Sequence, residues 1–158
     1  MGELGNDVLV GGPGNELLDG GPGNDSIDGG GGWNTVSYSG APRGVRLNLA
    51  LGRATVRGDG RDRLAAINAV IGSPFADLLV GDQFANELSG DAGNDTIRGG
   101  RGADVINGGP GNDLLCTASR LQDFENQRDY HPSRACRPGF VNLVELCWIV
   151  GTAEFGES

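Results

Sequence analysis

Acidic side chains recur in this sequence at a fixed interval, each two residues before an apolar residue. Asp7 and Asp25 are 18 residues apart, and the same interval separates Asp77, Asp95 and Asp113. Carboxylates are preferred ligands of hard divalent cations, which take about six to eight oxygens. An isolated Asx residue in a turn would more simply cap its own backbone. Because these carboxylates recur in register, we expect stacked pairs that share a cation.

The elements that must position these carboxylates are repeats of nine residues. Four units run from residue 2, with the sequences "GELGNDVLV", "GGPGNELLD", "GGPGNDSID" and "GGGGWNTVS", and five run from residue 72 to residue 116. A degenerate copy, "RGDGRDRLA", occupies residues 57–65. Glycine-rich turn formers fill the first six positions, and the last three predict a short strand with an inward apolar residue. These inward residues are Leu9, Leu18, Ile27, Val36, Leu64, Leu79, Leu88, Ile97, Ile106 and Leu115.

Two turn-plus-strand units would complete one coil of a flattened solenoid, so residues 18 apart should stack. The pattern resembles the RTX family, the hemolysin-type calcium-binding repeat proteins, whose unit is G-G-x-G-x-D-x-U-x. The resemblance implies an all-β chain that forms a parallel β-roll, a flattened right-handed solenoid. It also implies several Ca²⁺ ions between successive turns, usually in a secreted protein. Residues 36–77 are similar to the spacer often found between two repeat blocks of this family.

In the family, the sixth-position side chains of two stacked turns share an ion, and carbonyl groups of the glycine loops complete its shell. The pairs Asp7–Asp25 and Asp95–Asp113 fit best, because their loops keep the glycine at position 4. The pairs Asp77–Asp95 and Asn86–Asp104 should be weaker, since a phenylalanine replaces that glycine in one loop of each. The pair Glu16–Asn34 departs at both positions and favours an empty site. The candidate metal ligands are Asp7, Glu16, Asp25, Asn34, Asp77, Asn86, Asp95, Asp104 and Asp113, with Gly5, Gly14, Gly23, Gly93, Gly102 and Gly111.

Composition divides the chain into four predicted segments. Of 30 glycines, 27 precede residue 116. We expect a first repeat block at 2–37, spacer strands with one degenerate repeat at 38–71, a second block at 72–116 and a non-repeat tail at 117–158. Within the spacer, "GVRLNLALGRATV" alternates apolar and polar residues as a half-buried strand does. The run "LAAINAVIG" fits helix or strand by periodicity, and its place beside a degenerate repeat favours strand.

Charge limits the classes of partner. The net charge is −9 and the chain contains no lysine, so an electrostatic attraction to nucleic acid is not expected. No basic-plus-apolar segment precedes the repeats and no apolar run approaches the roughly 18 residues of a membrane span. Together with the secreted location that the resemblance implies, these features predict an extracellular protein without a recognisable N-terminal signal. The spacer arginines could form an anionic-ligand patch, although solvated outer-face charges are the favoured interpretation. A polysaccharide or cell-surface ligand remains open, as does the oligomeric state.

The tail does not follow the repeat. It holds the only histidine, and all three cysteines fall from Cys116 onward. A zinc site from His131, Cys136 and Cys147 is disfavoured by irregular spacing without a paired C-x-x-C, and three cysteines allow at most one internal disulfide. The segment "FVNLVELCWIV" could form a strand or short helix that covers the open end of the roll. The alternatives are an export signal or translation from a shifted reading frame.

Catalysis by this chain is not predicted. It has no H-E-x-x-H and no G-x-S-x-G motif. With one apolar residue per unit the core is thin, so metal binding should be coupled to folding. The sequence therefore predicts a calcium-binding module that folds in extracellular calcium and serves a structural or secretion-assisting role. The alternative is an accessory module or fragment of a secreted hydrolase, toxin or adhesin.

Overall fold

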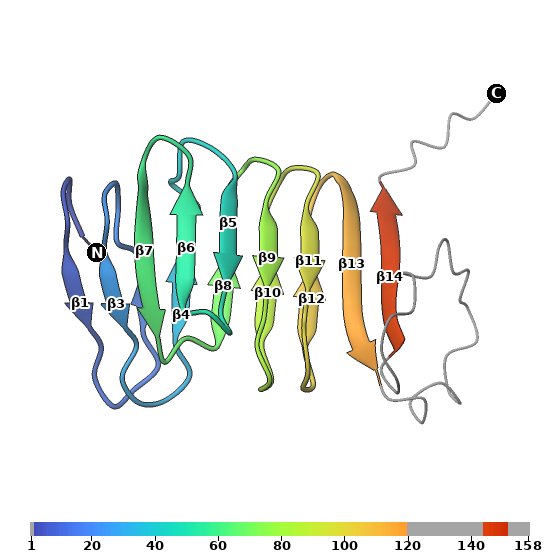
Figure 1. Ribbon diagram of the computed structural model, residues 1–158, viewed down its shortest axis with the longest axis horizontal. Helices are drawn as coiled ribbons and strands as arrows, with labels where there is room; N and C mark the ends of the chain where they lie inside the picture. Colours follow the sequence, from blue (N-terminus) through green and yellow to red (C-terminus); the bar gives the residue numbers. More distant parts are fainter. Residues whose placement is uncertain (1, 120–143, 152–158) are drawn as a thin grey trace.

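The chain winds into a flattened coil whose two sides are facing β-sheets (Figure 1). This computed structural model describes residues 2–119 and 144–151, and the side chains of residues 2–117. No helix that could cross a membrane occurs in that part of the chain. One sheet has nine strands, in the order β1 (Val8–Val10), β3 (Ser26–Asp28), β7 (Gly60–Ala65), β6 (Arg53–Val56), β5 (Val45–Asn48), β9 (Leu78–Val80), β11 (Thr96–Arg98), β13 (Asn112–Ser119) and β14 (Val144–Gly151). The other has five, in the order β12 (Val105–Asn107), β10 (Glu87–Ser89), β8 (Ala69–Ile71), β4 (Thr35–Ser37) and β2 (Leu17–Leu18).

Within each repeat block the strands pair in parallel at the predicted interval of 18 residues. Leu9 of β1 is opposite Ile27 of β3. In the second block Leu79 is opposite Ile97, which is opposite Leu115. The opposing sheet has the same register, as in the pairing of β10 with β12. The prediction of an all-β parallel β-roll is confirmed.

The eighth position of each unit supplies the core between the two sheets. Val36, Leu79, Leu88 and Ile97 are fully buried, and Ile27 is nearly so. The residues on either side of each point outward, because side chains alternate along a strand. Toward the two ends of the roll the same position is only half-buried, at Leu9, Ile106 and Leu115.

The spacer departs from the simple coil. Between β3 and β9 the larger sheet holds three strands, β7, β6 and β5, whereas the smaller sheet holds only β8 between β4 and β10. The strands β5, β6 and β7 form an antiparallel meander, which Figure 1 shows as the tall green and teal strands. Its last strand brings Leu64 opposite Ile27, so the degenerate repeat rejoins the register. The single strand expected from "GVRLNLALGRATV" is instead two strands, β5 and β6, joined by a turn at residues 49–52. The segment "LAAINAVIG" is strand as expected at the end of β7 and in β8, with a break at residues 66–68.

At the far end of the larger sheet β14 pairs with β13 in antiparallel orientation along eight residues. The strand expected from "FVNLVELCWIV" is therefore present over Val144–Gly151, and it occupies the edge that β13 would otherwise expose. Cys116 is disulfide-bonded, and Cys147 lies opposite it in this ladder. His131 and Cys136, which the zinc hypothesis required, lie outside the described residues.

Candidate metal centre

The turns that connect the two sheets form two edges, and the sixth-position residues stack along them. We call them the aspartate edge, where the chain enters strands of the larger sheet, and the asparagine edge, where it enters strands of the smaller sheet. The aspartate edge consists of Asp7, Asp25, Asp62, Asp77, Asp95 and Asp113. The asparagine edge consists of Glu16, Asn34, Asn68, Asn86 and Asp104.

Both edges are joined by the same hydrogen bond between successive turns. The backbone N–H of Asp95 donates to Oδ1 of Asp113 at 2.9 Å, and that of Asp77 donates to Oδ1 of Asp95 at 2.8 Å. On the asparagine edge the N–H of Asn86 donates to Oδ1 of Asp104 at 3.0 Å. Equivalent bonds join the remaining predicted pairs, Asp7–Asp25 and Glu16–Asn34. All five pairs predicted at an interval of 18 residues are therefore stacked neighbours.

The second carboxylate oxygen distinguishes the aspartate edge. Oδ2 of Asp25, of Asp95 and of Asp113 is buried and has no hydrogen-bond partner. Each of these oxygens lies against the first glycine of its own turn, where any added Cβ would collide with it. A buried, unpartnered carboxylate oxygen is costly unless a positive charge compensates it. The donor set and the space around it fit a hard cation.

The electrostatics of these carboxyls point the same way. Burial, the largest cause, and the neighbouring charges of Asp77 and Asp113 together raise the pKa of Asp95 to about 6, against the lowering effect of the hydrogen bond from the Asp77 N–H. Burial is also the main cause of the raised pKa of Asp25, to which the charge of Asp7 contributes. These shifts indicate stacked negative charges that have lost water without gaining a partner.

Side chains alone do not complete a metal shell. Among the described residues no group of three or more His, Cys, Asp or Glu side chains converges on one point. The remaining ligands would have to be loop carbonyls, and the turns do approach closely, because a Cβ on Gly23 or Gly111 would overlap a carbonyl of the preceding turn in the stack. The backbone φ angle at both glycines is positive, as it is at Gly5, Gly93 and Gly102, whereas Gly14 is not among the positive-φ residues.

On the asparagine edge, side-chain amides occupy the place of a cation. Nδ2 of Asn34 donates to the carbonyl of Gly31 in its own turn and to that of Ala66 in the next turn, both at 3.1 Å. A neutral amide thus bridges two turns. Glu16 and Asp104, at the two ends of this edge, carry carboxylates instead of amides, and Oε2 of Glu16 is buried and without a hydrogen-bond partner.

Two members of the edges were not predicted from the sequence, Asp62 and Asn68. They accept hydrogen bonds from the backbone N–H groups of Asp25 and Asn34, both at 3.0 Å, across intervals of 37 and 34 residues created by the meander. Each stands two residues before a buried apolar residue, Leu64 and Val70 respectively. That local pattern is the signal that could have identified them.

Unlike Asp25 or Asp95, Asp62 has both oxygens occupied. Its Oδ1 accepts from the Asp25 N–H and its Oδ2 accepts from the Tyr38 hydroxyl at 2.8 Å. Burial and the adjacent Asp62 charge raise the pKa of Tyr38 above its ordinary value, so the phenol stays protonated as a donor. Protein groups satisfy Asp62 without a metal.

Asp77 is also satisfied, by a residue that the repeat pattern does not provide. The Ser73 N–H and hydroxyl donate to its two oxygens, each at 2.6 Å, and the Val45 N–H donates at 2.7 Å. Phe75, which replaces the position-4 glycine, is exposed in this turn and its N–H donates to the Ser73 hydroxyl. The predicted weakness of the Asp77–Asp95 pair thus has a further physical reason in Ser73.

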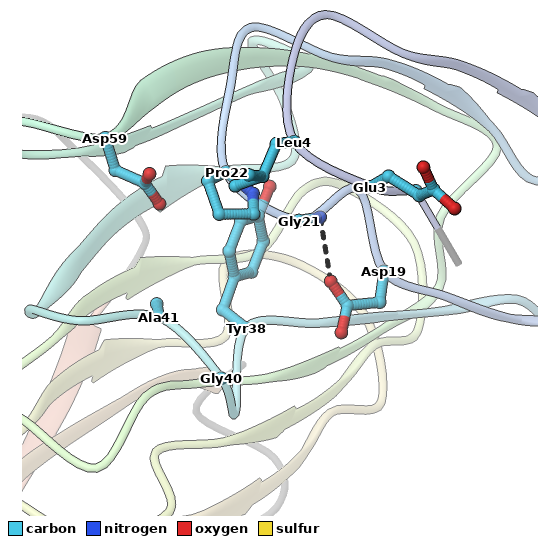
Figure 2. Close-up of a pocket in the computed structure, with 10 residues that line it drawn as sticks. Glu3, Leu4, Asp19, Gly21, Pro22, Tyr38, Gly40, Ala41 and Asp59 are labelled. Atoms are coloured by element: carbon cyan, nitrogen blue, oxygen red, sulfur yellow. Dashed lines mark hydrogen bonds between the residues drawn. The ribbon is translucent and has the colours of Figure 1, made fainter.

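A pocket of about 410 Å³ lies between the first turns of the roll and the start of the spacer (Figure 2). Its wall includes Leu4, Pro22 and the Tyr38 ring, and acids lie around it, of which Asp19 accepts a hydrogen bond from the Gly21 N–H. Histidine, cysteine and serine are absent from the described lining residues. Because the Tyr38 hydroxyl is engaged by Asp62, the pocket offers no free nucleophile.

Comparison with protein families finds one model that matches, described as the RTX calcium-binding nonapeptide repeat (4 copies). It matches residues 10–40, 71–104 and 80–115. No curated protein matches the chain. The matched ranges leave out residues 41–70, so the antiparallel meander lies outside the matched repeats.

Proposed function

The chain belongs, through its two repeat blocks, to the RTX calcium-binding nonapeptide repeat family, and we propose that its ions bind along the aspartate edge of the roll. Calcium binding by a β-roll module follows from the family, whose repeat is not itself catalytic.

One observation carries this assignment. Oδ2 of Asp25, Asp95 and Asp113 is buried without a partner, although Oδ1 of each is hydrogen-bonded to the preceding turn. The backbone bond fixes the orientation of each carboxylate. Oδ2 of each aspartate then faces the glycine loop of its own turn. Ca²⁺ prefers carboxylate and carbonyl oxygens as ligands, and both kinds are available there.

We assign the best sites to the pairs Asp7–Asp25 and Asp95–Asp113, with carbonyls of their glycine loops. Asp77–Asp95 ranks lower because Ser73 already satisfies Asp77. Asn86–Asp104 and Glu16–Asn34 rank lower still, because asparagine supplies a neutral ligand in each. Bound calcium supplies the positive charge that offsets two stacked carboxylates.

The chain's own residues explain why this binding would be coupled to folding. A unit of nine residues buries about one apolar side chain, so the core is thin for the backbone that it must order. Ionised aspartates stacked at successive turns oppose the same structure. The module is therefore disordered at low calcium, as inside a cell. It folds at the near-millimolar calcium outside, where it acts as a structural or secretion-assisting domain.

The test is a calcium titration of the full chain that is monitored by circular dichroism and calorimetry. A parallel titration with magnesium is the comparison. We expect a cooperative gain of strand signal with calcium only. In Asp113→Asn the midpoint should move roughly tenfold or more to higher calcium. Glu87→Gln, which removes one exposed charge from β10, should leave it within about twofold. A strand-rich spectrum that survives chelation would overturn the coupling, and equal midpoints in both variants would overturn the site.

A further inference from the structure

Four arginines project from one face of the antiparallel meander, in a molecule whose net charge is −9. We call this surface the arginine face: Arg46 of β5, Arg53 of β6, and Arg61 and Arg63 of β7. All four are exposed, and they alternate with buried residues that point into the core. The alternation places the guanidinium groups on the outer side of the larger sheet.

The arrangement is unfavourable for the fold alone. Arg53 lies directly opposite Arg63, while Thr55 lies opposite both Arg46 and Arg61 in the two adjoining ladders. Like charges directly opposite one another on a sheet are destabilising. None of these arginines forms an ion pair with an acidic residue in the part of the chain that the structure describes. A structural role therefore does not account for the pattern.

The surface is also hollowed, and neutral polar groups lie among its charges. A groove of about 490 Å³ is lined by Arg53, Arg61 and Arg63, together with Thr55, Asn24 and Ser26. Its lining also includes the carboxylates of Asp7, Asp25 and Asp62, of which Asp25 and Asp62 are buried. The inference therefore rests on the proposed function in one respect, because calcium bound by Asp7 and Asp25 offsets their charge. Hydroxyl and amide side chains thus lie among the charges, where they can hydrogen-bond the hydroxyls of a ligand. A guanidinium binds carboxylate or sulfate oxygens in a two-pronged, planar manner.

We propose that the arginine face binds an acidic polysaccharide through its carboxylate or sulfate groups. Charge complementarity favours an anion, and the interspersed Thr and Asn groups favour a hydroxyl-rich chain. Nucleic acid fits less well, because no aromatic side chain projects from the described strands of this face for base stacking. The meander then has a purpose, since it adds this face to a roll whose regular repeats lack it.

Binding of dextran sulfate by the full chain in saturating calcium tests the proposal, with neutral dextran and a single-stranded oligonucleotide as comparison probes. We expect dextran sulfate to bind, with an affinity that falls as salt rises. The double variant Arg53→Gln/Arg63→Gln should bind roughly tenfold or more weakly. The matched control is Arg98→Gln/Arg101→Gln, which removes the same charge from the exposed surface of the second block and should bind as the unmodified chain does.

Circular dichroism in calcium shows whether each variant is folded, which separates this test from that of the calcium sites. If the double variant does not fold, Arg53→Gln alone replaces it. Equal loss in the two double variants, no binding of dextran sulfate, or tighter binding of the oligonucleotide would each overturn the proposal.

Discussion

On the aspartate edge every sixth-position residue is an aspartate, whereas on the asparagine edge three of five are asparagines. Both edges use the same backbone N–H to Oδ1 bond, at 2.9 Å between Asp95 and Asp113 and at 3.0 Å between Glu16 and Asn34. Aspartate and asparagine differ only in the other terminal atom of the side chain, which is Oδ2 in aspartate and Nδ2 in asparagine. Oδ2 of Asp113 is buried without a partner, and Nδ2 of Asn34 donates to two carbonyls.

The comparison separates the shape of a turn from its stability. Because Oδ1 fixes the stacking on both edges, the shape does not depend on whether the other atom is oxygen or nitrogen. The net charge does depend on it. An amide bridges two turns on its own, whereas a carboxylate needs a cation to do the same. We infer that one edge of the roll is held by the protein and the other responds to calcium.

The largest effect should come from replacing Asp95, which stacks between Asp77 and Asp113, by the asparagine that is common on the other edge. Asp95→Asn removes a charged ligand from two adjoining pairs, so the calcium midpoint of folding should rise at least tenfold. Without calcium the same change removes a buried charge, so the chain should fold at a lower concentration of a stabilising osmolyte. Circular dichroism during calcium and osmolyte titrations measures both effects.

The opposite signs with and without calcium are the sharp feature of this prediction. Asn86→Asp, on the other edge and facing Asp104, is the matched control with the reversed change in charge. It should weaken the calcium-free fold and increase the calcium response. If Asp95→Asn destabilises the calcium-free fold and the calcium-bound fold equally, the two edges do not differ in the way we infer.

The next effect is expected at Asn34. Asn34→Asp removes the two amide donors to Gly31 and Ala66 and buries a charge, which should cost about 3 kcal/mol of stability. Osmolyte titration of the calcium-free chain, monitored by circular dichroism, measures this loss. Asn15→Asp, a change at the neighbouring exposed asparagine, should cost less than about 1 kcal/mol. Equal costs at the two positions would show that the amide bridge of Asn34 does not stabilise the roll.

The regular part of this structure could be predicted from the sequence because one period carries both turn and core. A count of nine residues placed Leu79, Ile97 and Leu115 in one ladder and Asp95 beside Asp113. Glycine-rich turns leave few alternative conformations, and the apolar eighth position decides which side of the strand faces inward. The register therefore follows from local chemistry.

The meander could be predicted as strands but not placed. Alternation over residues 45–48 indicates a half-buried strand, yet nothing in the sequence shows that β5 pairs with β9 while β7 pairs with β3. For the same reason Asp62 did not appear as a neighbour of Asp25, because an interval of 37 residues replaces that of 18. The hydrogen bond of Tyr38 to Asp62 depends on that placement as well.

A change in pH should act mainly on the aspartate edge, which holds four of the five aspartates whose pKa is raised, the fifth being Asp104 of the asparagine edge. The folded pKa of Asp95 is raised to about 6, above the ordinary value of about 3.9. Its ionisation therefore destabilises the calcium-free fold above pH 6. This penalty is relieved as pH falls from about 6 to about 4, because the folded state binds the proton first. The raised pKa values of Asp25, Asp62 and Asp77 act in the same direction.

The calcium-free chain should accordingly fold at a lower osmolyte concentration at pH 5 than at pH 7.5. The calcium midpoint should shift the other way, to higher calcium at pH 5, because protons compete for the same oxygens. In Asp95→Asn both shifts should shrink. A calcium-free stability that does not change between these two pH values would contradict the assignment of buried, unpartnered charges to the aspartate edge.

The smallest effect is expected at Asp62, where a protein group takes the place of a cation on the aspartate edge. The Tyr38 hydroxyl donates to Oδ2 of Asp62, much as Nδ2 of Asn34 donates to the carbonyls of Gly31 and Ala66 on the other edge. Tyr38→Phe keeps the ring and leaves that oxygen buried and unpartnered, so the calcium-free fold should lose about 1 to 3 kcal/mol. Asp62 would then resemble Asp25, which it follows in the stack, and the calcium response of the first block should increase.

In the double variant Tyr38→Phe/Asp62→Asn the charge is absent, so the loss of stability and the gain in calcium response should both diminish. If Tyr38→Phe lowers stability without changing the calcium response, an unpartnered oxygen is not sufficient to recruit the ion, and the loop carbonyls of each turn must decide which aspartates bind it.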